Sequence, residues 1–517
     1  MDKIKFSFLG RKFLPLISLK GKKGRARFKM PPGPNGLEPF GRAGTATLIM
    51  ALLLLSGCTK IAATGERHFS LVGEEQEVQM GAESDEEIIE TMGLYPSPEL
   101  QNYVQALGAR LAAATERPDL PWTFRVVDDN VVNAFALPGG YVYITRGIMA
   151  RFENEAQLAG VLGHEIAHVT AKHAVIRLSR SMLAQLGFGI ARVVEPGLEP
   201  FAPLAGAGLQ LLFLKYSRED ETEADLLGIR YMARVEENPR ELMDVMAMLA
   251  RNSAAEKKGV MPQWASTHPL PENRLEVIGE QLQTVPAKKY EPVERESYLR
   301  RLEGMVYGDD PREGYTRDNL FYHPTLRFRL DFPAGWEILN QKRVVVAISP
   351  ERQATIQMTL AKLSSSAEGI KALFGKEGIA GQSAEQVTIN GLPAATGTFL
   401  ARTDKGVIAG RAMFIEYAGR IYQLVGYSLQ PQWRQFAGDI RQTMESFAEL
   451  TDPKFLQVEP YRLAVVQIEA PVTLADWYRA NPAPVQLEEI ARLNQMEADD
   501  LLAPGRLLKT VVGGPPD

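Results

Sequence analysis

The stretch Asn154-Glu-Ala-Gln-Leu-Ala-Gly-Val-Leu-Gly-His-Glu-Ile-Ala-His-Val-Thr170 decides how the first half of this chain folds. Asn is a preferred residue at the N-cap of a helix, and Gln157 follows at the spacing of a capping box. The apolar residues after it recur at the period of a helix. The pattern therefore predicts a helix that begins at Asn154 and has residues 164–168 in its middle.

Two histidines and a glutamate lie near the middle of this predicted helix. Residues four apart are about 40° apart around a helix axis and one turn along it, so His164 and His168 can reach the same ion. Glu165 projects beside them and can act as the general base for an attacking water. A catalytic zinc takes three protein ligands and keeps one position open, so a third ligand must come from elsewhere in the chain.

A second helix with an acidic start is predicted at Ser217-Arg-Glu-Asp-Glu-Thr-Glu-Ala-Asp225. Ser is a good N-cap, and acidic side chains stabilise the first turn of a helix. Glu221 and Asp225 are four residues apart and face the same way. One of these carboxylates can bind zinc while the other accepts a hydrogen bond from the distal N–H of a ligand histidine.

Two neighbouring residues are predicted to stay outside the ligand set. His173 lies five residues after His168, about 140° around a continuous helix, so it cannot join the same ion. We interpret it as a histidine at the surface or behind the ligands. Glu223 is interpreted as a solvated acid, and it is the alternative ligand if the register of the second helix is shifted by two residues.

Residues 70–285 resemble a family of zinc metallopeptidases that includes the CaaX prenyl-proteases, HtpX and the periplasmic BepA-like enzymes. The resemblance rests on four separate motifs that occur in the same order as in the family. The segment from His164 to His168 matches the ligand and base motif of that family. The acidic helix start matches its Ser-Arg, Glu and Ala-Asp motif. The resemblance implies that Glu221 is the third ligand of one Zn²⁺ and that Asp225 supports a ligand histidine.

The first of the four motifs is Asn133-Ala-Phe-Ala-Leu-Pro-Gly-Gly-Tyr-Val-Tyr143, which resembles the active-site edge strand of the family. In the family this strand pairs with the backbone of the substrate. We therefore expect an extended substrate to add beside residues 141–145, held by backbone hydrogen bonds. The residues expected at this strand are Asn133, Gly139, Gly140, Tyr141 and Tyr143.

The last motif is Thr267-His-Pro269 followed by Arg274, which resembles the late His-Pro segment of the family. Two roles are open for this segment. The resemblance implies that His268 and Arg274 donate hydrogen bonds to the tetrahedral oxyanion. Alternatively, His268 is a fourth ligand that displaces the water and makes the enzyme latent.

The second half of the chain has the pattern of antiparallel strands. Apolar and polar residues alternate at 326–332, 354–360 and 411–417, and a helix is predicted over 432–447. Residues 319–450 resemble a PsbP-like α+β module, after a linker at 286–318 that is rich in charge and in Pro and Gly.

Residues 451–517 resemble a degenerate LysM domain. The pattern is a strand at 463–468, two helical stretches and a closing strand at 502–511. The LysM fold holds polymers of N-acetylglucosamine, but Pro471-Val-Thr473 stands where the motif has Gly-Asp-Thr. A peptidoglycan tether and an inert spacer therefore remain equal alternatives for this unit.

The single cysteine, Cys58, follows an apolar run at 48–55 and a basic N-terminal stretch. One cysteine excludes a disulfide framework. The run is shorter than the roughly 20 apolar residues that span a bilayer, so it is interpreted as an export signal. Leu55-Ser-Gly-Cys58 resembles a bacterial lipobox, which implies a signal peptide over 1–57 and a lipid on Cys58. Thr59 in place of Asp favours the outer membrane.

Charge and motifs together predict an exported α+β protein. Residues 1–42 carry nine excess positive charges, so the net charge of −5 leaves −14 on the remainder, which argues against nucleic acid as a partner. We predict a mainly helical zincin domain over 58–285 with a small edge-strand sheet, followed by the antiparallel module and the βααβ LysM-like unit.

The predicted function is a zinc-dependent endopeptidase, lipid-anchored in the periplasm, that acts on misfolded or assembling envelope proteins. Two alternatives remain open. One is a chaperone for outer-membrane proteins in which zinc is mainly structural. The other is a peptidoglycan-binding scaffold.

Overall fold

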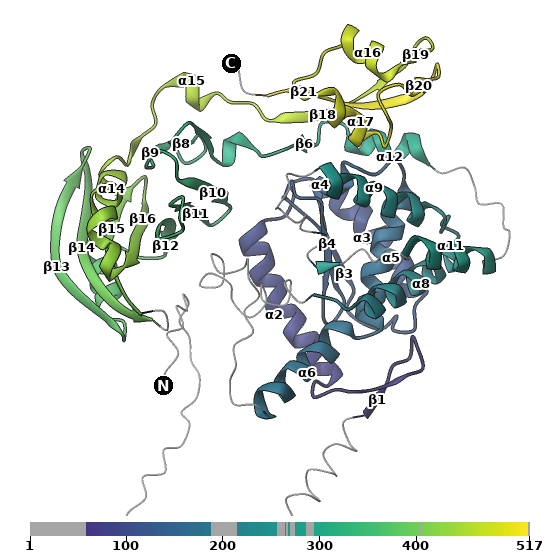
Figure 1. Cartoon of the computed structure of the whole chain (residues 1–517), viewed down its shortest axis with the longest axis horizontal. Helices are drawn as coiled ribbons and strands as arrows, with labels where there is room; N and C mark the ends of the chain where they lie inside the picture. Colours follow the sequence, from purple (N-terminus) through teal and green to yellow (C-terminus); the bar gives the residue numbers. More distant parts are fainter. Residues whose placement is uncertain are drawn as a thin grey trace, which may run out of the picture.

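The computed structural model describes residues 58–187, 215–255, 264, 267–268, 274–285, 294–403 and 406–514. The expected signal peptide at 1–57 lies outside the described residues. The chain forms a mainly helical region over the predicted zincin domain, called the protease region after that prediction, a β-rich middle module to one side, and a C-terminal unit that lies against the protease region (Figure 1). The mixed helix and sheet content confirms the predicted α+β class. Among the described residues, none of the helices has both the length and the apolar character to cross a bilayer.

The protease region contains a short N-terminal hairpin, a three-stranded sheet and a set of packed helices. Its elements are β1 (Cys58–Lys60), β2 (Arg67–Phe69), α2 (Glu74–Met92), α3 (Pro98–Ala113), β3 (Thr123–Val127), β4 (Ala134–Leu137), β5 (Tyr141–Thr145), α4 (Arg146–Met149), α5 (Glu155–Thr170), α6 (His173–Gly187), α8 (Arg218–Arg234), α9 (Glu241–Ala255) and α11 (Arg274–Thr284).

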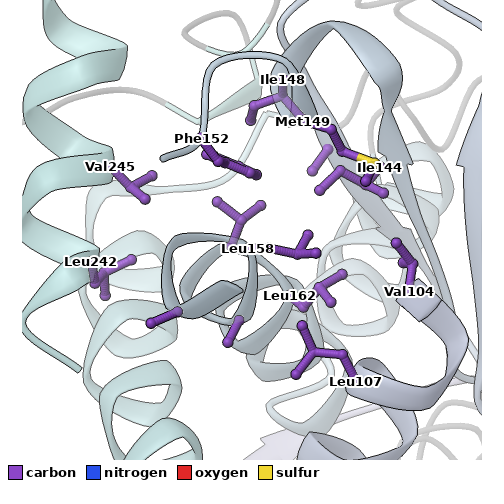
Figure 2. Packing of buried hydrophobic residues seen from close by; sticks show 14 of the residues in the cluster. Val104, Leu107, Ile144, Ile148, Met149, Phe152, Leu158, Leu162, Leu242 and Val245 are labelled. Atoms are coloured by element: carbon purple, nitrogen blue, oxygen red, sulfur yellow. The ribbon is translucent and has the colours of Figure 1, made fainter. Parts of the chain in front are cut away.

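Helix α5 runs through the centre of this region. Its N-cap is Asn154, whose side chain accepts a hydrogen bond from the backbone N–H of Gln157, as predicted. Every residue from Ala156 to Thr170 is buried, so α5 is covered on all sides. Figure 2 shows the apolar half of this packing, where Leu158 and Leu162 face side chains of α3, β5, α4 and α9.

The expectation that a substrate adds beside residues 141–145 is wrong, whereas the motif at 133–143 does include an outer strand. The strand order is β3-β5-β4, with β5 parallel to β3 and antiparallel to β4, so β5 is the central strand. β3 and β4 are the two outer strands of this sheet. Side chains alternate in the same way in edge strands and central strands, so the sequence pattern does not distinguish them. The two differ only in whether the strand is paired on one side or on both. Tyr141 and Tyr143 therefore lie one strand away from the edge.

The middle module is built on a seven-stranded antiparallel sheet in the order β10-β11-β12-β16-β15-β14-β13, with a four-stranded sheet in the order β17-β9-β8-β7. The strands and helix predicted here are present as parts of β9, β12, β15 and α14. The elements are η1 (Pro311–Glu313), β7 (Tyr315–Arg317), β8 (Leu320–His323), β9 (Phe328–Asp331), β10 (Glu337–Gln341), β11 (Val344–Ile348), β12 (Ala354–Ala361), α13 (Ser366–Phe374), β13 (Ile379–Ile389), β14 (Leu392–Thr403), β15 (Gly406–Tyr417), β16 (Arg420–Leu429), η2 (Gln430–Gln432), α14 (Trp433–Glu445) and β17 (Ala448–Glu449).

In the C-terminal unit, β18, α16, α17 and β21 lie where the two strands and two helices were expected, and the short strands β19 and β20 lie between them. β18 and β21 pair antiparallel. β18 also pairs with β6, which lies in the segment expected to be a linker. The same segment holds helix α12, whose inner side chains are buried. The elements are α12 (Arg295–Leu302), β6 (Val306–Tyr307), α15 (Pro453–Leu456), β18 (Tyr461–Gln467), β19 (Val472–Thr473), α16 (Leu474–Ala480), α17 (Leu487–Leu493), β20 (Leu501–Leu502) and β21 (Leu507–Gly513).

The C-terminal unit and the protease region share one hydrophobic core. Leu463, Leu508 and Val511 belong to the same buried cluster as the apolar residues around α5. The Lys509 ammonium is fully buried and donates to the carbonyl oxygens of Ala150 and Phe152, at 3.0 and 2.7 Å. The unit is therefore a structural part of the protease region.

Candidate metal centre

Helices α5 and α8 bring the predicted ligands together. Ligand atoms of His164, His168, Glu221 and His268 all lie within 4.8 Å of one another, and all four residues are buried. The Nε2 atoms of His164 and His168 are 3.1 Å apart. The nearest Glu221 oxygens lie 3.6 and 3.5 Å from these two nitrogens. Two imidazoles and one carboxylate from two helices thus point at a common centre.

The two helices reach this geometry because they touch through glycine. A Cβ added to Gly228 of α8 would lie 3.1 Å from the backbone nitrogen of His164, so only glycine allows this approach without displacement. Ser217 fixes the start of α8 with a full capping box, in which its side chain accepts from the backbone N–H of Asp220. The first turn of α8 is therefore held where Glu221 faces α5.

The residues present fit a zinc ion. Zinc binds imidazole nitrogen at about 2.0–2.1 Å in tetrahedral sites, which places two such nitrogens roughly 3.3 Å apart, close to the separation found here. Neither carboxylate oxygen of Glu165 has a hydrogen-bond partner, although the side chain is completely buried. Burying an unpartnered carboxylate is costly, so such a group in a folded protein calls for a functional explanation. Burial also raises the pKa of Glu165 above its usual range.

Asp225 lies where the sequence placed it, behind His164. Its Oδ1 is 2.9 Å from His164 Nδ1, so this carboxylate accepts a hydrogen bond from Nδ1–H and leaves Nε2 free to bind metal. Arg274 donates to both oxygens of Asp225 and lies 3.0 Å from Glu221 Oε2 through Nη1. In this structure Arg274 therefore neutralises the carboxylates of α8.

His268 lies inside the ligand cluster. Its Nδ1 is 2.9 Å from Glu221 Oε1 and 3.4 Å from His164 Nε2, and its Nε2 is 3.6 Å from Glu165 Oε1. The ring stacks on Trp264, with centroids 4.2 Å apart and planes 16° apart. The side chain is thus held between the general base and the ligands.

The residues expected at the edge strand are spread over the β4–β5 hairpin. Asn133 is buried just before β4. Gly139 and Gly140 form the turn with φ angles of 83° and 100°, a region that favours glycine. Tyr141 is half-buried. The hydroxyl of Tyr143 donates to Asp85 of α2 at 2.7 Å, so this side chain points away from the metal centre.

The strand that faces the metal centre is β4. Its residues Ala136 and Leu137 line a small pocket together with His168 and Tyr216. Tyr216 stacks on the His168 ring, with centroids 3.8 Å apart and planes 18° apart. The sequence analysis did not single out Tyr216, although it directly precedes the Ser217 cap. Of the two outer strands, β4 is the one whose residues line this pocket, so a strand added to the β4 edge lies beside the ligands.

The comparison with known proteins agrees with this geometry. The model of peptidase family M48 matches residues 98–282. A putative beta-barrel assembly-enhancing protease of Vibrio cholerae is 34% identical over 207 residues, which is 38% of this chain and 42% of that protein. The mitochondrial metalloendopeptidase OMA1 of Schizosaccharomyces pombe is 30% identical over 234 residues, which is 44% of this chain and 68% of that protein.

The chain spans less than half the length of the bacterial relatives, with 42% of the Vibrio cholerae protein covered. Among solved structures, the cyanobacterial PsbP of Synechocystis is 14% identical and matches 26% of this chain and 95% of that chain, at a TM-score of 0.22. At that level the PsbP-like interpretation of the middle module stays a prediction, as does the LysM-like one. The family match, the coverage of the yeast enzyme and the ligand set show that the chain belongs to peptidase family M48, a family of zinc metallopeptidases.

Proposed function

We propose that this chain is a zinc-dependent endopeptidase that cleaves unfolded or assembling proteins of the bacterial envelope. The observation that carries the proposal is the buried cluster of His164, His168 and Glu221 beside a glutamate with no hydrogen-bond partner. A structural zinc site needs no such glutamate, because its coordination is closed by protein ligands. This difference favours the enzyme over a chaperone with structural zinc.

Glu165 is the residue placed to move protons. Bound zinc supplies a Lewis acid that polarises the scissile carbonyl and favours deprotonation of water. Glu165 takes the proton from the attacking water and passes it to the leaving amine. Its unpartnered oxygens are free for both transfers. Asp225 meanwhile holds the ring of His164 in the ligand orientation.

Substrate binding is proposed along β4. This strand has one free edge in the described sheet, and Ala136 and Leu137 lie in the pocket that contains His168. A peptide added there as an extended strand is held mainly by its backbone. Such binding requires a segment that is not already paired in a folded domain, which is why we propose unfolded or incompletely assembled proteins as substrates.

Of the two roles open for His268, the geometry favours that of a fourth ligand. Its ring nitrogen lies in the same cluster as the three predicted ligands, and the ring fills the space beside Glu165. A substrate carbonyl needs that space. We therefore propose that this arrangement is a latent form and that His268 leaves the cluster when substrate binds. Arg274 is proposed to keep the α8 carboxylates charged during this change.

The envelope location is proposed from the N-terminal sequence and from the relatives. Cys58 follows the lipobox-like Leu55-Ser-Gly, and we propose that a lipid on Cys58 anchors the protein in the outer membrane, facing the periplasm. The names of the bacterial relatives refer to beta-barrel assembly, which is a process of that membrane. The C-terminal unit shares its core with the protease region, which favours a structural role over a free peptidoglycan tether.

Glu165→Gln in the full chain tests the proposal. We expect cleavage of an unfolded protein such as casein to fall at least about 100-fold, because proton transfer by a positioned base contributes about 10²–10⁴-fold. Zinc content, measured by atomic absorption, should stay at one ion per chain. Glu219→Gln, at an exposed acid in the first turn of α8, is the control and should cleave normally. Full activity of the Glu165 variant would refute the proposal.

A further inference from the structure

A break in the helical backbone brings a second histidine to the ligand His168. α5 ends at Thr170, and Lys172 has a φ of 58°, in the left-handed region. The Lys172 ammonium is held by the buried Glu77 at 3.0 Å. α6 then starts at His173, so His173 does not continue the helical path of α5. The expectation that His173 lies 140° away from His168 assumed one continuous helix, and neither Gly nor Pro marks the break.

His173 forms the middle of a chain of three side chains. His173 Nδ1 is 2.8 Å from His168 Nδ1, and His173 Nε2 is 3.0 Å from Glu223 Oε2. His168 and His173 are buried, with 1% and 3% of their side chains exposed, whereas 35% of Glu223 is exposed. The chain thus runs from the metal centre to the surface of α8.

The protonation states along this chain follow from metal binding. His168 must present the lone pair of Nε2 to the ion, so its proton is on Nδ1. That N–H can donate only if His173 Nδ1 is an acceptor, which puts the proton of His173 on Nε2. Glu223 then accepts from His173 Nε2. Each hydrogen bond therefore has one donor and one acceptor, without a charged histidine.

The two ligand histidines are supported by two carboxylates of the same helix. Asp225 is four residues after Glu221 and contacts His164 directly, at 2.9 Å. Glu223 is two residues after Glu221, about 200° around the helix, and cannot reach His168 itself. The ring of His173 spans that distance.

We infer that His173 and Glu223 are positioning residues that hold His168 in its zinc-binding tautomer and orientation. Neither residue touches the metal position or the substrate. Removal of a side chain that hydrogen-bonds a metal-ligating histidine typically lowers metal affinity or activity by about 10–100-fold. The inference rests on the proposed zinc site. It adds Glu223, acting on His168 through His173, to the direct support that Asp225 gives His164.

Other groups around His173 do not replace Glu223. Asp220 Oδ1 lies 3.9 Å from His173 Nε2, too far for a hydrogen bond, and its side chain is engaged by Arg177 and by the backbone N–H of Ser217. Tyr216 stacks on the face of His168 and makes no hydrogen bond to its ring edge. The described neighbours therefore leave Glu223 as the acceptor for His173.

The test measures zinc affinity of full-chain variants by competition with a chelator. His173→Phe keeps a ring but removes the acceptor, and we expect zinc to bind about 10–100-fold more weakly. His173→Asn places an amide oxygen near the position of Nδ1 and should recover affinity to within about threefold of the native chain. Glu223→Leu should weaken binding about tenfold, and Glu219→Leu, on an exposed part of the same helix, should leave it unchanged.

A second measurement separates positioning from general stability. The visible absorption spectrum of the Co²⁺ form reports ligand geometry, and it should change in His173→Phe and return in His173→Asn. If His173→Phe does not fold, Glu223→Leu decides the matter, because Glu223 is partly exposed and its loss leaves no buried cavity.

The outcomes distinguish the inference from the proposed function. Zinc affinities within twofold of the native chain for both His173→Phe and Glu223→Leu, with unchanged Co²⁺ spectra, would overturn the inferred positioning role of His173 and Glu223. The proposed protease function would be unaffected by that result. A native chain that binds no zinc would overturn both. A native chain that binds zinc but cleaves no unfolded protein would contradict the proposed function, while the variants would still test whether His173 and Glu223 position His168.

Discussion

The protease region and the middle module bury different kinds of side chain. The protease region buries acids, bases and histidines, among them Glu77, Arg117, Glu165 and Arg274. Within residues 319–403 and 406–450 the buried polar side chains besides tyrosine are hydroxyls, namely Ser349, Ser366, Thr396, Ser428 and Thr443. Burial of ionisable groups costs free energy unless they are paired. The difference shows that, among the described residues, buried ionisable groups other than tyrosine are concentrated in the region that holds the metal centre and are not found in the middle module.

The strongest test of this contrast uses the buried ion pair of Glu77 and Arg117, in which Arg117 Nη1 lies 2.8 Å from Glu77 Oε1. Glu77→Leu leaves the guanidinium buried without its carboxylate. We expect the free energy of unfolding of the protease region to fall by about 3–5 kcal/mol. Urea unfolding followed by hydrogen–deuterium exchange measures the two regions separately.

The matched substitution in the middle module is Thr396→Val. Thr396 is buried, and its hydroxyl donates to the carbonyl oxygen of Ala412 at 2.9 Å. The hydroxyl also accepts a hydrogen bond from Arg411 Nη1 at 3.3 Å, so the variant loses two hydrogen bonds but leaves no buried charge without its partner, and we expect a cost of only about 1–2 kcal/mol. Equal losses in the two variants would contradict the contrast between the regions.

Removal of zinc should affect one region only. A ligand at 100 times its Kd stabilises the folded state by about 2.7 kcal/mol, so chelation should lower the unfolding free energy of the protease region by about that amount. The middle module offers no cluster of metal ligands among its described residues and should be unaffected. A calorimetric scan with and without chelator would show the shift. A shift in both transitions would mean that the regions unfold as one unit.

A smaller effect is expected in acid. Burial raises the pKa of Glu77, but the hydrogen bonds and charges of Arg117 and Lys172 outweigh it and hold this pKa below its usual value. A lowered pKa in the folded state gives stability that is present above the usual value and lost as the pH falls through the folded one. The protease region should therefore lose stability below about pH 4.5, and Glu77→Gln should make this loss shallower. Identical acid profiles would argue against the pairing.

Much of the metal centre could be predicted because its information is local. The two helix starts at Asn154 and Ser217, and the spacing of the histidines and carboxylates, depend on neighbours in sequence. The strands of the middle module were predictable for the same reason. The family resemblance then identified Glu221 among the acids of α8.

The features that sequence reasoning missed depend on contacts between distant segments. The central place of β5 results from pairing on both sides with β3 and β4. The left-handed Lys172 is held by Glu77, which lies 95 residues earlier. The roles of His173 and of the C-terminal unit follow from such contacts. None of these has a periodic or capping signal in the sequence.

The shared core has a consequence for the order of events during synthesis. Gln495 hydrogen-bonds Gln157 at the first turn of α5 across 338 residues of sequence, and β21 comes later still. A polypeptide leaves the ribosome from its N-terminus. Helix α5, which carries Glu165, therefore lacks its hydrogen bond with Gln495 until that late segment of the chain has been made.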